Sequence, residues 1–188
     1  MTAVLVIILI IILLLVFVVG GYFVSTQRSL VRMDENCKNA LGQIQVQLNS
    51  RWDALLALAK TASAYAKHES ETLIQTINAR RQAQVSTAQE VQRQEGELQQ
   101  IMGRLMAIGE AYPDLKANDL YLRTMDGVRN YEENVRMSRM VYNDSATLLN
   151  RAVRQWPSSF VASMLNFRER DYLKTDDESK RGMPQIFE

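Results

Sequence analysis

The sequence predicts an all-α protein in which an N-terminal transmembrane helix continues into a long antiparallel bundle of three to four helices. Three observations support this fold class. The first is an uncharged apolar run from Ala3 to Val24. The second is the abundance of residues that favour helices (Gln, Ala, Leu, Arg, Glu and Met) between only three prolines, Pro113, Pro157 and Pro184. The third is the helical spacing of apolar residues through the rest of the chain.

The apolar run is long enough to cross a bilayer. From Ala3 to Val19 every side chain is aliphatic or aromatic, and the run continues to Val24. As a helix it spans ~33 Å, whereas the hydrocarbon core of a bilayer is ~30 Å thick. A cleaved signal peptide is the alternative, but the run has no basic start, is too long, and ends in a poor cleavage site. We therefore assign residues 1–26 as a transmembrane anchor whose partner is the lipid bilayer.

The residues that flank the anchor predict its orientation. No Lys or Arg precedes the run, whereas Arg28, Arg32 and Lys38 follow it. The positive-inside rule then places the N-terminus outside and the remaining chain in the cytoplasm. The single cysteine, Cys37, agrees with a reducing compartment, and we interpret it as a small apolar residue on a helix face.

Composition excludes several classes of function. The 22 basic and 21 acidic residues are interspersed, so no basic surface for nucleic acid is expected. One His and one Cys cannot supply a zinc site or a ferritin-type carboxylate site, and no glycine-rich phosphate loop is present. The sequence therefore predicts no catalytic residue, no metal, no cofactor and no enzymatic activity. Residues 27–173 are assigned to the helical bundle and residues 174–188 to a C-terminal tail.

Apolar spacing places the helices of the bundle. Three long helices are expected over about 28–67, 71–111 and 118–156, with a short one over 159–167. The first has a main apolar stripe and, apart from Gly20-Gly21, nothing separates it from the anchor, so the two should form one continuous helix. Ser70 and Asn118 are the expected N-caps of the second and third helices.

The third helix carries the most regular pattern. Six residues recur every seven positions, namely Tyr121, Val128, Val135, Tyr142, Leu149 and Trp156. A strict heptad repeat predicts coiled-coil-like packing against a neighbouring helix. Single glycines within the second helix, such as Gly103 and Gly109, are interpreted as positions of close helix packing.

Several patches along the chain have the spacing of a known family. They are Leu41-Gly42-Gln43-Ile44-Gln45-Val46-Gln47-Leu48, Arg51-Trp52-Asp53, Tyr65, His68-Glu69, Ala79-Arg80, Leu105-Met106-Ala107-Ile108-Gly109-Glu110, Ala111-Tyr112-Pro113-Asp114-Leu115-Lys116-Ala117, Arg139, Val141-Tyr142-Asn143, Asn150, Trp156-Pro157 and Gly182-Met183-Pro184-Gln185-Ile186-Phe187. From Ala40 onward the chain thus resembles the LemA family of bacterial membrane-anchored helical proteins. The resemblance implies a helical bundle behind a transmembrane helix in the bacterial cytoplasmic membrane, with no established enzymatic activity.

The chain departs from the family pattern after Asp53. Family members usually carry a Pro-Asn pair there, whereas this chain continues with Ala54-Leu55, so its first helix should lack a proline kink. The signature residues are expected to form a structural network that fixes helix register. They are Tyr65, Glu69, Arg80, Glu110, Tyr112, Pro113, Asp114, Arg139, Tyr142, Asn143, Asn150, Trp156 and Pro157.

These observations favour a membrane-anchored, non-enzymatic structural or scaffolding protein that forms homo-oligomers. Val46, Leu56 and Leu58 lie off the main apolar stripe of the first helix, which suggests additional neighbours. The stretch from Ala3 to Val19 is a second candidate assembly surface. One alternative is an adaptor or signalling module that binds another membrane protein. Another is an enzyme that uses Glu110, Arg80 and Tyr142 in a bundle pocket.

Overall fold

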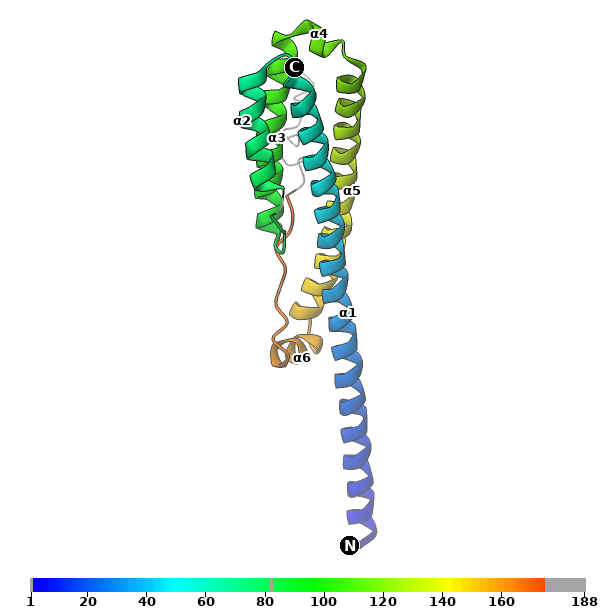
Figure 1. The fold of residues 1–188 in the computed structure, drawn as a ribbon. Coiled ribbons are helices and arrows are strands. Elements are labelled where there is room, and N and C mark those ends of the chain that lie inside the picture. The colour runs from blue at the N-terminus through cyan, green and yellow to red at the C-terminus, as the bar shows by residue number, and fades with distance from the viewer. Residues whose placement is uncertain (1, 82, 175–188) are drawn as a thin grey trace, which may run out of the picture. The chain divides into compact units, whose positions relative to one another are not determined.

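The computed structural model describes residues 2–81 and 83–174 of the chain. These residues form helices and no strand, which confirms the all-α prediction (Figure 1). The helices are α1 (Thr2–Ala62), α2 (Lys67–Arg80), α3 (Ala88–Ala111), α4 (Pro113–Lys116), α5 (Asp119–Arg154) and α6 (Ser158–Met164). The predicted C-terminal tail lies outside the described residues, except for Lys174.

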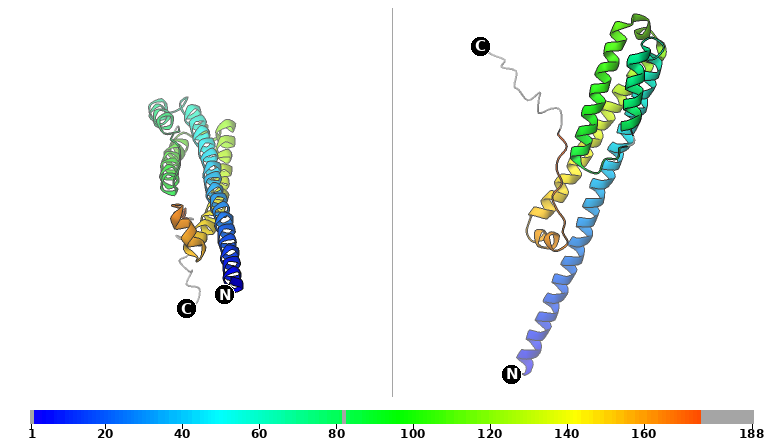
Figure 2. Two further views of the ribbon diagram at one scale, coloured as in Figure 1. Left: turned by 90° about the horizontal axis from the view of Figure 1, so that it is seen from below. Right: turned by 60° about the vertical axis from the view of Figure 1, so that its left-hand side comes forward.

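The described chain forms two compact units. The first unit combines residues 2–37 with residues 144–170, and the second combines residues 38–143 with residues 171–174. Helices α1 and α5 therefore each contribute to both units. In the second unit α2 and α3 lie side by side, and α4 joins α3 to α5 (Figures 1 and 2).

Helix α1 joins the apolar run to the first bundle helix without a break, and it stays helical through Gly20-Gly21. It is the one helix of the described chain that is long and apolar enough to cross a membrane. Its predicted apolar stripe is buried, namely at Leu30, Cys37, Leu41, Ile44, Leu48, Trp52, Leu55 and Ala59. Its end at Ala62 comes earlier than the predicted end near Lys67.

The predicted single helix over residues 71–111 is wrong, because the structure has two helices there, α2 and α3. Thr87 begins α3 with a capping box: its hydroxyl accepts a hydrogen bond from the Glu90 N–H, and the Glu90 carboxylate accepts one from the Thr87 N–H. Ser70 is not an N-cap either. It is buried inside α2, which begins at Lys67.

Two glutamines, one from α1 and one from α3, hold the connection between α2 and α3. The Gln45 side chain of α1 accepts a hydrogen bond of 2.6 Å from the Val85 N–H, and the Gln94 side chain of α3 donates one of 2.6 Å to the Ala83 carbonyl. The Trp52 indole N–H donates to Gln94 at 3.4 Å. These bonds satisfy backbone groups that a continuous helix would have paired internally.

Helix α5 begins as predicted. The Asn118 side chain accepts hydrogen bonds from the N–H groups of Leu120 and Tyr121. The heptad seam is buried through Leu149, but its last position is wrong: α5 ends at Arg154, and Trp156 beyond it is 84% exposed. The short helix α6 covers Ser158–Met164 rather than residues 159–167.

Val46, Leu56 and Leu58 of α1 were expected to need neighbours from a second copy, and for two of them this expectation is wrong. Leu56 and Leu58 are buried within this chain, so they do not need a second copy to cover them. Only Val46 of the three is exposed. Evidence for assembly must therefore come from other surfaces.

Of the three glycines of α3, Gly109 lies at a position of close packing as predicted, whereas the same prediction for Gly103 is wrong. Gly103 and Gly109 should therefore respond in opposite directions to alanine. A Cβ at Gly109 would lie 2.4 Å from the Tyr121 hydroxyl, which donates a hydrogen bond to the Leu105 carbonyl, whereas a Cβ at Gly103 meets nothing within 4 Å. Gly109→Ala is expected to lower the free energy of unfolding by about 1–3 kcal/mol. Gly103→Ala should raise it by about 0.5–1 kcal/mol. Denaturant unfolding of the two variants beside the wild type measures both changes, and equal effects would contradict the packing at Gly109.

Candidate functional site

Tyr142 and Asn143 hold a non-helical C-terminal segment against α5 in the second unit. The Asn143 amide pairs with both backbone groups of Leu173: its Nδ2 donates to the carbonyl at 2.8 Å, and its Oδ1 accepts from the N–H at 2.9 Å. The Tyr142 hydroxyl donates to the Asp171 carbonyl at 3.0 Å. Because Tyr142 and Leu173 are buried, these bonds fix a packed segment rather than a solvated one.

Asn150 makes the same kind of contact within the first unit. Its Nδ2 donates to the Arg170 carbonyl at 2.9 Å, and its Oδ1 accepts from the Arg170 N–H at 2.8 Å. The Arg170 guanidinium in turn pairs with Asp34 of α1 at 2.6 Å. Burial raises the pKa of the nearby Cys37 thiol, with Arg170 opposing the shift and Asp34 adding to it. A buried, protonated thiol agrees with the interpretation of Cys37 as a packing residue.

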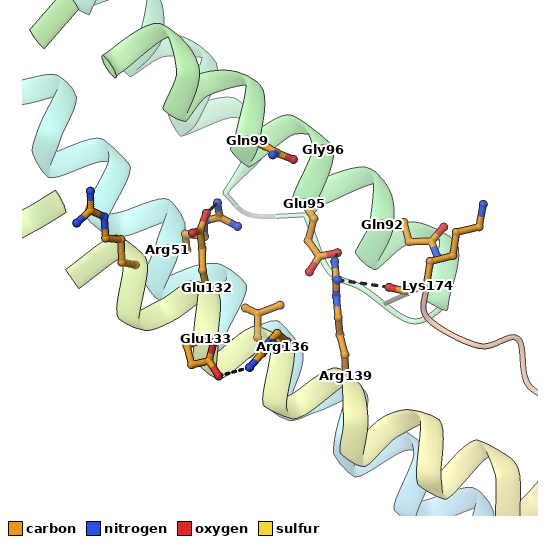
Figure 3. A pocket seen from close by; sticks show the side chains of 12 residues that line it. Arg51, Gln92, Glu95, Gly96, Gln99, Glu132, Glu133, Arg136, Arg139 and Lys174 are labelled. Carbon is orange, nitrogen blue, oxygen red and sulfur yellow. Dashed lines mark hydrogen bonds and ion pairs between the residues drawn. The ribbon is translucent and has the colours of Figure 1, made fainter. Parts of the chain in front are cut away.

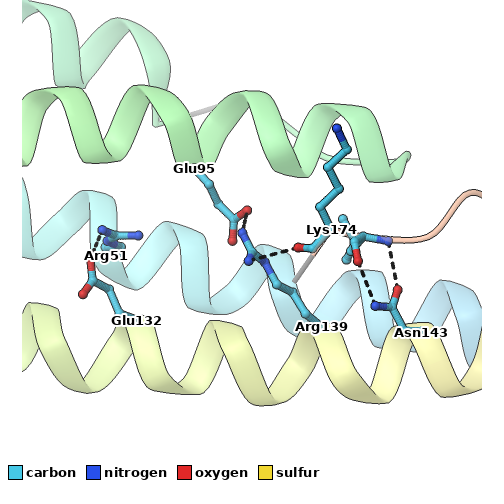
Figure 4. A network of polar contacts seen from close by, with 7 residues as sticks. Arg51, Glu95, Glu132, Arg139, Asn143 and Lys174 are labelled. Carbon is cyan, nitrogen blue, oxygen red and sulfur yellow. Dashed lines mark hydrogen bonds and ion pairs between the residues drawn. The ribbon is translucent and has the colours of Figure 1, made fainter. Parts of the chain in front are cut away.

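Two ion pairs tie α5 to its neighbours in the second unit (Figure 4). Arg139 pairs with Glu95 of α3, and the two side chains are only 11% and 10% exposed. Arg139 also donates to the Lys174 carbonyl at 3.4 Å. Arg51 of α1, whose side chain is 7% exposed, pairs with Glu132. Burial lowers the pKa of the Arg51 guanidinium, while Glu132 opposes this shift.

A polar cavity of about 660 Å³ lies beside these pairs (Figure 3). Its lining consists of Arg51, Gln92, Glu95, Gly96, Gln99, Arg129, Glu132, Glu133, Val135, Arg136, Arg139 and Lys174. The lining holds no hydroxyl, thiol or imidazole, and its one amine is that of Lys174. Three of its arginines, Arg51, Arg136 and Arg139, each pair with a glutamate of the same lining. This arrangement can balance charge between helices. Within the described chain, no group of three or more His, Cys, Asp or Glu side chains could hold a metal ion.

The structure does not bring Arg80, Glu110 and Tyr142 together. Arg80 at the end of α2 pairs with Glu97 at 2.7 Å on the surface. Glu110 is exposed and lies thirteen residues beyond Glu97 along α3, which is ~20 Å by helical rise. Burial raises the pKa of Tyr121, and the nearby charge of Glu110 raises it further. The pocket required by the enzymatic alternative is therefore absent from the part of the chain that the structure describes.

Three other signature residues shape the junction between α3 and α4. Tyr112 is the residue between the two helices, and its N–H donates to the Ile108 carbonyl. Pro113 occupies the first position of α4, where its missing N–H leaves no intrahelical bond unmade, and Asp114 lies in the favourable first turn. This junction is a structural turn.

The remaining signature residues lie on the surface or at a helix start. Tyr65 follows the end of α1 and is 38% exposed, and Glu69 lies exposed in the first turn of α2. Pro157 precedes α6 as its N-cap residue, and Trp156 is exposed. None of these four side chains lines the polar cavity.

Sequence reasoning missed Glu95 as the partner of Arg139, although a signal was present. Glu95 follows Val91 by four residues and precedes Leu98 by three, so the apolar spacing places a carboxylate at a core position. On α5, Arg139 likewise follows Val135 by four residues and precedes Tyr142 by three. A carboxylate and a guanidinium at core positions of two helices need a partner, and each is the partner of the other.

Comparison with known proteins places these features in a family. The sequence model of the LemA family matches residues 40–187. A protein named Protein LemA from Metamycoplasma hominis is 26% identical over 146 residues, which is 77% of this chain and 67% of that protein.

Two further relatives carry magnetosome names. Magnetosome protein MamQ of Magnetospirillum gryphiswaldense is 33% identical over 89 residues, and Magnetosome protein MamQ 2 of Paramagnetospirillum magneticum is 29% identical over 89 residues. In each case the alignment covers 46% of this chain and 33% of the relative. The chain thus spans about a third of the length of these MamQ relatives.

Proposed function

The chain belongs to the LemA family, and we propose that it is a membrane-anchored structural protein that self-assembles through its helical bundle. The proposal is based on the ion pairs that the buried charged groups form between helices. Glu95 and Arg139 pair with each other between two helices, and Arg51 pairs with Glu132. Charges used in this way fix helix register, and their pairing between helices supports a structural, non-enzymatic role.

The assembly surface of the proposal lies on the outer face of α5. Met137, Met140 and Val141 are 54%, 52% and 49% exposed and lie within one turn of the helix, opposite the buried seam. Three large apolar side chains gathered on one helix face favour a protein partner over water. A second copy of the chain is the partner that a shared membrane would supply at a raised local concentration.

The anchor of the proposal is the apolar part of α1. All large apolar side chains from Val4 to Val19 are exposed in the chain alone, as lipid contact requires. Arg28 and Arg32 follow the run and support an orientation with the bundle in the cytoplasm. The bacterial cytoplasmic membrane is the compartment that this orientation implies. Protease treatment of spheroplasts tests the orientation, because a cytoplasmic bundle would survive until the membrane is opened.

Charges placed on the α5 face should abolish assembly. We expect the full chain, extracted in mild detergent, to have the mass of an oligomer, and the Met137→Glu/Met140→Glu variant to have the mass of a monomer. Both positions are exposed, so the fold should tolerate the changes. Light scattering coupled to gel filtration gives the mass, and circular dichroism confirms the helix content.

The matched control places two glutamates on the exposed surface of α3. The Gln100→Glu/Ala107→Glu variant adds the same charge and should keep the oligomeric mass. A wild-type monomer at all concentrations would contradict the proposal. If instead a different protein co-purifies and only the α5 variant loses it while the mass of the chain is unchanged, the adaptor function replaces the structural one.

A further inference from the structure

A second group of exposed apolar side chains lies in the first unit, at and before α6. Trp156, Phe160 and Met164 are 84%, 66% and 59% exposed. Phe160 and Met164 are four residues apart and share one face of α6. The opposite face is already packed, because Val161 and Ala162 are buried. Among the residues that the structure describes, none covers this outer face.

The position of this group relative to the anchor identifies the cover. Residues of α1 from Ser25 to Met33 line a cavity of about 410 Å³ together with Gln155 and Ser158, which flank Trp156. The apolar run ends just before Ser25, and Arg28 is the first charged residue. Because ~20 helical residues fill the hydrocarbon core, this level of α1 falls in the headgroup region. In this unit α6 lies next to α1, at the end of α5 closest to the apolar run (Figure 1).

The charges at this level match a lipid surface. Arg28 and Arg32 of α1 and Arg151 and Arg154 of α5 are exposed in the same unit. Arginines near the bilayer attract anionic headgroups. A tryptophan prefers this region because its ring is apolar while its indole N–H can remain hydrated.

We propose that Trp156 and the outer face of α6 form an interfacial docking surface that inserts into the headgroup region of the bilayer crossed by α1. The proposal rests on the membrane anchor of the proposed function. Its partner is the lipid surface itself, because a bilayer that contains the anchor lies at the level of Gln155 and Ser158. The contact would give the chain a second attachment to the membrane and fix the orientation of the first unit on it.

Tryptophan fluorescence can test the insertion, since the chain has two tryptophans in opposite environments. Trp52 is fully buried and serves as the internal control. The full chain and its Trp156→Phe variant are reconstituted into vesicles of phosphatidylcholine and phosphatidylglycerol. The difference between their spectra reports Trp156. We expect it to be blue-shifted, quenched more by lipids brominated near the headgroup than by lipids brominated deep in the chain, and protected from aqueous iodide.

A second pair of variants tests the outer face of α6. Phe160→Ser/Met164→Ser should increase the quenching of Trp156 by iodide at least twofold. Leu120→Ser/Leu122→Ser, which alters exposed apolar residues of the other unit outside the proposed assembly surface, should leave that quenching unchanged.

Vesicle flotation separates the possible failures. If the chain does not float with the vesicles, the anchor and the docking surface are both overturned. If it floats while iodide quenches Trp156 freely, only the docking surface is overturned. The same holds if neither quencher reaches Trp156, because a second copy or another protein then covers it.

Discussion

Glu95→Leu is expected to lower the free energy of unfolding by about 3–5 kcal/mol, which is a large part of the stability of a typical domain. The substitution removes the carboxylate and leaves the Arg139 guanidinium, whose side chain is only 11% exposed, with its charge uncompensated. Replacing both partners by apolar residues removes the charge as well. The Glu95→Leu/Arg139→Leu variant should therefore recover most of the loss.

Guanidinium chloride unfolding of the full chain in mild detergent measures these differences, with Trp52 emission and circular dichroism as probes. The control is Arg123→Gln, which breaks the pair with Asp119. Both partners of that pair are more than three-quarters exposed, so the change should stay within about 0.5 kcal/mol. A loss for Glu95→Leu no larger than that of the control would show that the Glu95–Arg139 pair is not buried in the folded protein.

The long helices α1 and α5 could be predicted because their apolar residues repeat with helical spacing. The seam of α5 from Tyr121 to Leu149 and the stripe of α1 are both buried where the spacing places them. The seam fails at Trp156, because spacing does not mark where a helix ends. The end of α5 at Arg154 precedes a Trp-Pro pair, and proline disfavours helical backbone at the residue before it.

The break between α2 and α3 was missed because helix-forming residues continue through it. A local signal exists in the capping box from Thr87 to Glu90, but the remaining cause is distant in sequence. Gln45 lies about 40 positions away and binds the Val85 N–H. A helix propensity scale cannot register a side chain that arrives from another helix, so tertiary contacts override it.

The roles of Asn143 and Asn150 were equally hidden in the sequence. Each amide binds the backbone of a segment without helical periodicity, at Leu173 and Arg170 respectively. Any non-proline residue presents the same N–H and carbonyl, so the partner leaves no pattern to read. The family resemblance pointed to both asparagines, and the structure supplies the physical reason that they occupy these positions.

Asn143→Ala is expected to destabilise the segment at Leu173 by about 2 kcal/mol, because both backbone groups of this buried residue lose their partner. Opening of the segment should then be ~30-fold more frequent, and the Leu173 amide should exchange its hydrogen correspondingly faster. Hydrogen exchange of the full chain, followed by mass spectrometry or NMR, measures this rate. Asn150→Ala should accelerate exchange at Arg170 instead, since that amide depends on the other asparagine. Asn130→Ala alters an exposed asparagine of α5 and should change neither amide. If exchange at Leu173 is unchanged in the Asn143 variant, the packing of the Leu173 side chain, and not the amide of Asn143, holds the C-terminal segment on α5.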